Sequence, residues 1–205
     1  MSRNKLIINA KIAFFILALL PLARLVWLGV TDDLGANPVE FVIRSLGTWS
    51  LVGLLVTLSV TPIRLITGIK WPVQLRRMMG LFAFFYVCLH LLAYAGLDQW
   101  FDWHAISKDI VKHPYILVGF SAFLLLIPLA ATSNQAMIRK LRQRWQALHR
   151  LVYLIAILGV THYWWLVKKD VREPLVYALV LLALLLIRIY DRKPAAMGRL
   201  QPKAT

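Results

Sequence analysis

Cysteine and acidic residues are both scarce in this sequence. Cys88 is the only cysteine among 205 residues, so the chain cannot form an intrachain disulfide and cannot by itself assemble a cysteine-ligated zinc or iron–sulfur site. Only nine residues are acidic, and none of them falls deep in the apolar segments described below. Because membrane proton relays usually include buried carboxylates, this absence argues against such a relay.

Apolar residues are abundant instead, and they occur in long runs. They make up 60% of the sequence, compared with about 45–50% in typical globular proteins, and the mean hydropathy is +0.68. The formal net charge is +15, a value that would also suit a nucleic-acid-binding protein. Basic residues that punctuate membrane-length apolar runs are, however, topology signals. We therefore expect a membrane protein that contacts lipid and binds no nucleic acid.

Six apolar segments are each close to the roughly 20 residues that a helix needs to cross a bilayer. They cover residues 12–30, 46–65, 79–97, 115–131, 147–167 and 174–189. The sequence therefore predicts an all-α integral membrane protein, a six-transmembrane-helix bundle formed by residues 1–190 as a single domain. Residues 191–205 are predicted to form a short polar tail without regular structure. No internal repeat is apparent.

The distribution of charge along the chain predicts the orientation of this bundle. Most lysine and arginine residues lie near the N-terminus, in the second and fourth loops and in the tail, whereas nearly all acidic residues lie in the other loops. Loops rich in lysine and arginine stay on the cytoplasmic side of a membrane. Both termini and the tail are therefore predicted to be cytoplasmic, and the acidic loops to face the opposite side.

Three histidines fall inside apolar segments, where an ionisable side chain is costly and is a candidate for function. His90 and His162 lie at similar distances from the basic ends of their segments, and so at similar depth in the outer half of the bilayer. Two facing imidazoles are the ligand set of a six-coordinate b-type heme, and we expect this pair to ligate heme iron. His149 precedes His162 by 13 residues, which places it about 19.5 Å closer to the cytoplasm on a straight helix. It therefore belongs to a separate inner site, as a ligand or as an interfacial residue.

The histidines and the basic residues near them also have other interpretations. A membrane histidine can hydrogen-bond between helices, and the chain could be a proton-coupled transporter or a plain membrane anchor for a periplasmic enzyme. The 13-residue spacing turns His149 about 220° away from His162 on an ideal helix. An inner heme would then need a π-bulge or a ligand from another helix, such as Met78 or Met79. The basic cluster that includes Arg77 would contact anionic lipids, or hold a heme propionate or a flavin phosphate.

Motifs spread over nearly the whole chain resemble one family. They are LGANPVE in the first outer loop, the Thr61-Pro62 pair, RRMMGL followed by LHLLAY, HPYILVG, and TSNQAMIRKLRQRWQALHRLVYLIAILGVTHYWW. Together they resemble the heme-binding membrane subunits of the bacterial periplasmic methionine-sulfoxide reductase system, within the ferric-reductase-like transmembrane superfamily.

The resemblance implies a function for the bundle. It implies a b-type cytochrome of the bacterial inner membrane with one or two hemes b, ligated by His90, His149 and His162, and with Arg77 where the superfamily usually has an inner ligand. It further implies that electrons come from the quinone pool or a cytoplasmic flavin reductase, with FMN as a candidate second cofactor. The electrons would pass to a separate periplasmic molybdopterin enzyme that reduces methionine sulfoxide and so repairs oxidised proteins. The chain itself would then carry no catalytic residue.

Overall fold

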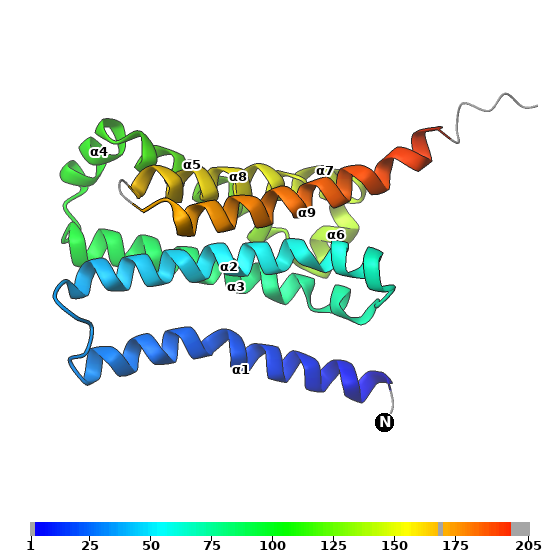
Figure 1. The fold of residues 1–205 in the computed structure, drawn as a ribbon, viewed down its shortest axis with the longest axis horizontal. Coiled ribbons are helices and arrows are strands. Elements are labelled where there is room, and N and C mark those ends of the chain that lie inside the picture. Colours follow the sequence, from blue (N-terminus) through cyan, green and yellow to red (C-terminus); the bar gives the residue numbers. More distant parts are fainter. Residues whose placement is uncertain (1–2, 168–169, 198–205) are drawn as a thin grey trace, which may run out of the picture.

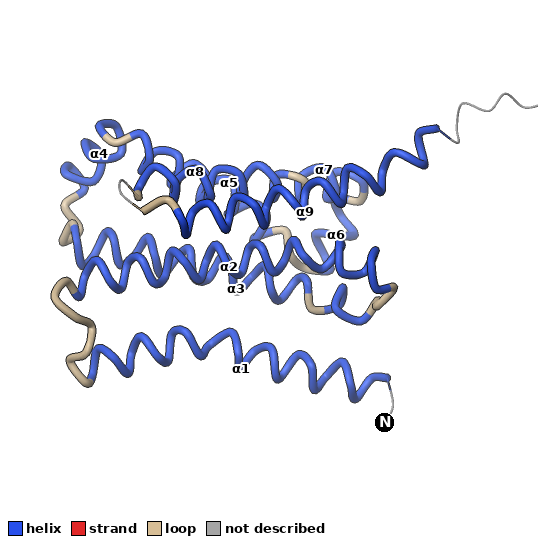
Figure 2. The backbone as a smooth tube through the Cα atoms, viewed as in Figure 1, coloured by secondary structure: helices blue, strands red, loops and turns tan. Residues whose placement is uncertain are grey.

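A computed structural model describes residues 3–167 and 170–197 of the chain. Every regular element within these ranges is a helix, as Figure 2 shows. The long helices are α1 (Arg3–Val30), α2 (Pro38–Thr67), α3 (Arg76–Ala93), α5 (Pro114–Ala131), α8 (Leu151–Leu166) and α9 (Arg172–Met197). The short elements are the 3₁₀ turn η1 (Trp71–Gln74), the π-helical turn η2 (Tyr94–Asp98), α4 (Trp103–Lys112), α6 (Gln135–Leu141) and α7 (Gln143–His149).

The long helices run roughly parallel to one axis and form two tightly packed pairs. The antiparallel helices α2 and α3 make the most extensive contact, and α5 with α8 makes the next. In Figure 1, α1 lies along one side of the α2–α3 pair, and α5, α8 and α9 lie along the other. The main apolar core lies between these two pairs and α9; Leu58 and Ala83 in it are 1% exposed and Ala156 is 0% exposed.

The described part of the chain contains five helices that are long and apolar enough to cross a membrane. They are α1, α2, α3 together with η2, α5 and α9. The remaining predicted segment, residues 147–167, is not one continuous helix, because α7 ends at His149 and α8 begins at Leu151. Helix α8 has 16 residues and is therefore about 24 Å long.

The predicted loops gather at the two ends of the bundle according to charge. The start of α1, the α2–α3 connection, α6, α7 and the end of α9 lie at one end, and α4 lies at the other (Figure 1). The first group holds most of the lysine and arginine residues. We call this the basic end, and the end with α4 the acidic end.

One local feature differs from the sequence-based expectation, and a second creates an unpaired backbone carbonyl. Helix α9 continues to Met197, so the first residues of the predicted polar tail are helical, while residues 198–205 lie outside the described range. In α2, Pro62 lies inside the helix and has no N–H for the carbonyl of Leu58, four residues earlier. This carbonyl therefore needs another donor, and the donor is a side chain of α9 described below.

Candidate functional site

The rings of His90 and His162 face each other across the bundle. His90 lies near the end of α3 and His162 near the end of α8. Their ring centroids are 6.3 Å apart, and the ring planes are 77° to each other. Metal–nitrogen bonds of about 2 Å would place two imidazoles that ligate one iron with their nitrogens about 4 Å apart and their ring centres about 6 Å apart. The structure thus brings together the two residues that the sequence paired by depth, at a separation that fits a shared iron.

A backbone carbonyl fixes the orientation and the tautomer of each ring. Nδ1 of His90 lies 2.9 Å from the carbonyl oxygen of Ile43 in α2, and Nδ1 of His162 lies 2.6 Å from that of Tyr115 in α5. Because a carbonyl oxygen only accepts, both Nδ1 atoms must carry the proton. In the neutral rings, Nε2 then keeps its lone pair for a metal, the arrangement that protein-bound metal–histidine sites generally use.

A glycine lies against each of these rings. A Cβ atom at Gly47 would lie 3.1 Å from Nδ1 and Cε1 of His90. A Cβ atom at Gly119 would lie only 2.7 Å from Nδ1 of His162. Each imidazole is therefore packed directly on the backbone of the neighbouring helix, and no larger residue fits at Gly119 without displacing the ring.

These contacts form a repeated arrangement. In each half, the histidine follows its carbonyl partner by 47 residues. Ile43, Gly47 and His90 in the α2–α3 pair correspond to Tyr115, Gly119 and His162 in the α5–α8 pair, with a constant offset of 72 residues. The sequence analysis missed this repeat, because apart from the glycine and the histidine few residues coincide. The relation lies in backbone placement, and the shared Gly-to-His spacing was the only signal for it.

The third membrane histidine, His149, lies at the basic end in different surroundings. Its ring stacks on Trp145 with centroids 3.9 Å apart, and its Nδ1 lies 3.1 Å from the Trp145 carbonyl oxygen. Its Nε2 is 3.5 Å from Oγ of Ser133, a long contact. Helix α7 ends at His149 and α8 begins at Leu151, and Arg150 between them has helical dihedral angles. No second histidine faces His149, and the described residues contain no cluster of three or more histidine, cysteine or acidic side chains that could hold a metal ion.

The basic side chain that accompanies His149 is Arg76. Arg76 is half-buried and close enough to His149 to interact with it electrostatically. Arg77, the residue singled out from the sequence, is exposed. The reason is helical geometry: Arg76 precedes His90 by 14 residues, which is nearly four full turns, so both lie on one face of α3. The same periodicity could have identified Arg76 from the sequence.

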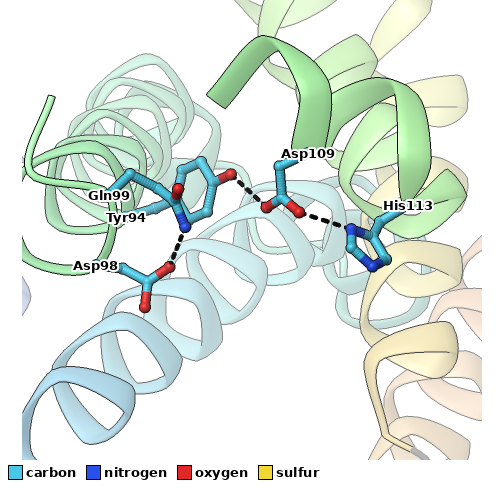
Figure 3. A network of polar contacts seen from close by, with 5 residues as sticks. All are labelled: Tyr94, Asp98, Gln99, Asp109 and His113. Carbon is cyan, nitrogen blue, oxygen red and sulfur yellow. Dashed lines mark hydrogen bonds and ion pairs between the residues drawn. The ribbon is translucent and has the colours of Figure 1, made fainter. Parts of the chain in front are cut away.

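A polar network at the acidic end connects the two halves of the repeat (Figure 3). Tyr94, four residues after His90, donates its hydroxyl to Oδ2 of Asp109 at 2.7 Å. The other oxygen of Asp109 lies 2.6 Å from Nδ1 of His113, at the start of α5. A carboxylate on α4 thus joins the end of the His90 helix to the helix that supplies the carbonyl for His162. This pairing was not predicted from the sequence, although Asp109 and His113 have the i,i+4 spacing of a helical pair.

Comparisons with known proteins agree on one family. Residues 46–160 match the family model described as "Ferric reductase like transmembrane component". The "Protein-methionine-sulfoxide reductase heme-binding subunit MsrQ" of Rhodospirillum rubrum is 57% identical over 87% of this chain and 86% of its own length. Proteins of the same name from Herminiimonas arsenicoxydans and Ralstonia nicotianae are 50% and 53% identical, each over 88% of this chain and 84% of their own length. No solved structure matches the chain. The chain is therefore a membrane protein that belongs to the ferric reductase-like transmembrane family, in the group of proteins named MsrQ.

Proposed function

We propose that the chain is the heme-binding, electron-transferring membrane subunit of a protein-methionine-sulfoxide reductase. The facing pair of His90 and His162 carries this proposal, because both rings are held by carbonyls with Nε2 free and their centres are 6.3 Å apart. Relatives at 50–57% identity that are named heme-binding subunits support it. Heme b, when bound, supplies a one-electron ferric–ferrous couple.

In this proposal the protein binds the heme, orients it and keeps it inside the apolar helix bundle. His90 and His162 would both ligate the heme iron, and the iron would then pass electrons and bind no substrate. Gly47 and Gly119 let the rings pack on neighbouring helices, and the carbonyls of Ile43 and Tyr115 fix the ring orientation. Sulfoxide reduction would therefore take place on a partner, a periplasmic molybdopterin enzyme, and this chain would deliver the electrons.

The remaining features of the proposal concern topology and the electron donor. Six spans, with α8 as the short sixth, would put both termini in the cytoplasm and the acidic end at the periplasm of the bacterial inner membrane. Electrons would enter at the basic end from the quinone pool or from a cytoplasmic flavin reductase, with FMN as a candidate second cofactor. His149, accompanied by Arg76, would serve an inner heme or this entry point.

A pyridine hemochrome assay on the purified protein tests the proposal. We expect heme b in the wild type and a reduced heme content in both His90→Ala and His162→Ala. His104→Ala, at an exposed position on α4, is the matched control and should keep its full heme content. A proton-coupled transporter would be purified without heme. A plain anchor would still support reduction by its partner in the His90→Ala variant, and either result would refute the electron-transfer role.

A further inference from the structure

A buried arginine of α9 carries a charge that no acidic side chain of the described residues balances. Arg188 is only 7% exposed. It donates from one terminal nitrogen to the hydroxyl of Tyr153 on α8 and from the other to the carbonyl of Leu58 on α2. Its guanidinium carbon lies 5.0 Å from the centre of the Tyr153 ring. These contacts join α9 to two other helices near the basic end.

Pro62 explains one of these contacts but not the charge. The Leu58 carbonyl lacks its helical donor because Pro62 has no N–H, and Arg188 fills this place. A neutral donor would do the same, whereas a buried guanidinium without a counter-charge is costly. Nε of Arg188 is also buried without a hydrogen-bond partner. The structure thus leaves both a positive charge and a donor unsatisfied.

No carboxylate of the described residues compensates for Arg188. The ion pairs in this part of the chain are Arg44–Glu40, His113–Asp109 and Arg172–Asp170, and all three lie towards the acidic end. Asp191, three residues further along α9, is exposed and forms no ion pair within the described ranges. The missing negative charge must therefore come from outside the described chain.

Further basic residues near Arg188 extend towards the surface. Arg76 is close enough to interact electrostatically with both Arg188 and Arg64. Arg64 and Lys70 line an open cavity of about 360 Å³, together with Leu65, Gly68 and Val73, where α2 ends and η1 begins. We call Arg64, Lys70, Arg76 and Arg188 the inner basic cluster. It runs from the exposed α2–α3 connection to a side chain in the core.

We propose that the inner basic cluster binds the headgroup of an anionic phospholipid, whose phosphate would lie in the cavity at Arg64 and Lys70 and offset the positive charge of the nearby Arg76 and Arg188. Basic pockets between membrane helices on the cytoplasmic side are well suited to such headgroups, and arginine pairs with phosphate through two parallel hydrogen bonds. The cavity opens at the end of the apolar part of α2, which is the level of the headgroups if α2 spans the bilayer. A lipid with two phosphates matches four basic side chains better than a lipid with one.

Native mass spectrometry of the purified, full-length protein tests this site. Diphosphatidylglycerol, phosphatidylglycerol and phosphatidylcholine are added in mixed micelles, and retained lipid and thermal stabilisation are measured. We expect one retained anionic lipid, with stabilisation decreasing in the order in which the lipids are named. Arg64→Gln with Lys70→Gln changes only exposed residues and should weaken binding about fivefold for each charge removed. Arg188→Gln should weaken it at least as much, and Arg139→Gln, which removes an exposed charge on α6 at the same end, should have little effect.

The outcomes separate this site from other sources of oxyanions. Equal lipid retention in Arg139→Gln and in the Arg64→Gln, Lys70→Gln double variant would overturn the proposal, because the attraction would then be general to the basic end. Unchanged lipid binding in Arg188→Gln with reduced heme or FMN content would also overturn it, because a propionate or a flavin phosphate would then be the occupant. The lipid result does not depend on electron transfer, so this proposal and the proposed function can fail separately.

Discussion

The acidic and basic ends of the bundle differ in how a possible heme ligand is held. At the acidic end, His90 and His162 face each other, and each has a carbonyl on Nδ1 and a glycine against its ring. At the basic end, His149 faces no second histidine, stacks on Trp145 and has Arg76 nearby. The site at the acidic end is therefore a preformed pair, whereas the basic end offers one imidazole and positive charge.

The comparison of the two ends shows that the repeat is clear only at the acidic end. The 72-residue offset holds for the carbonyl, the glycine and the histidine of the site at the acidic end. Towards the basic end the relation weakens, because α8 is interrupted before Leu151 whereas α3 starts at Arg76 without a break. The two helix pairs thus repeat each other at the acidic end, whereas the basic end has only His149. The two ends should therefore respond differently to substitution.

Replacing the glycines that lie against His90 and His162 should have the largest effect on heme binding. Gly119→Ala would place a methyl group 2.7 Å from Nδ1 of His162, and Gly47→Ala would place one 3.1 Å from His90. Overpacking of this kind costs about 1–3 kcal/mol, so we expect heme binding to weaken about five- to hundredfold, most strongly for Gly119→Ala. Heme titration of the purified apoprotein, followed by Soret absorbance, measures this change.

The matched control for the glycines is Gly159→Ala. A Cβ atom there would make only an ordinary contact with Leu51, at 3.6 Å. Alanine is more stable than glycine inside a helix by about 1 kcal/mol, so a heme defect in Gly119→Ala cannot result from a weaker helix. Normal heme affinity in both Gly119→Ala and Gly47→Ala would contradict the proposed ligand pair.

Replacing His149 at the basic end should have an intermediate effect on heme content. His149→Ala is expected to leave the six-coordinate spectrum of the pair at the acidic end in place and to remove only the heme, if any, bound at the basic end. The reason is distance: 13 residues separate His149 from His162, which is about 19.5 Å along a helix. Heme-to-protein ratio and low-temperature absorption spectra measure the change. If His149→Ala lost as much heme as His90→Ala, the two ends would form one site and the comparison would be wrong.

Weakening the polar network at the acidic end should have the smallest effect. Asp109→Asn removes the charge that holds Tyr94 and His113, and we expect a loss of about 1–2 kcal/mol in the free energy of unfolding with little change in heme content. Thermal unfolding monitored by tryptophan fluorescence and Soret absorbance would show both. Asp98→Asn is the control, since the exposed Asp98 accepts a hydrogen bond from its neighbour Gln99 and not from Tyr94 or His113. A strong loss of heme in Asp109→Asn would mean that α4 helps to position the ligands directly.

Much of the fold follows from the sequence, because membrane helices are defined by length and apolarity. The apolar segments became helices, and the loops rich in lysine and arginine gathered at one end. His90 and His162 could be paired because depth in parallel helices can be counted from the basic ends. Only one histidine of each segment falls at that depth, so no other histidine competed for the pairing.

Other features could not be predicted, or were missed, for physical reasons that differ. The break between α7 and α8 at Arg150 was not predicted, because nothing in the local sequence, such as a proline, marks it. Arg188 lies within the predicted segment 174–189, and the rule that made membrane histidines candidates should have identified it as well. Its partner, the Leu58 carbonyl, is left without a helical donor by Pro62. This contact joins two helices, so it could not be predicted from either segment alone.

The repeat also has a consequence for assembly of the protein. His90 belongs to the α2–α3 hairpin and His162 to the α5–α8 hairpin, and contacts within each hairpin are far more extensive than those between them. A molecule bound to both imidazoles would tie the two hairpins together, and mass action would then favour their docked arrangement. A chain without such a bound molecule would hold its two helix pairs together only through their few mutual contacts, and we expect it to be the less stable form.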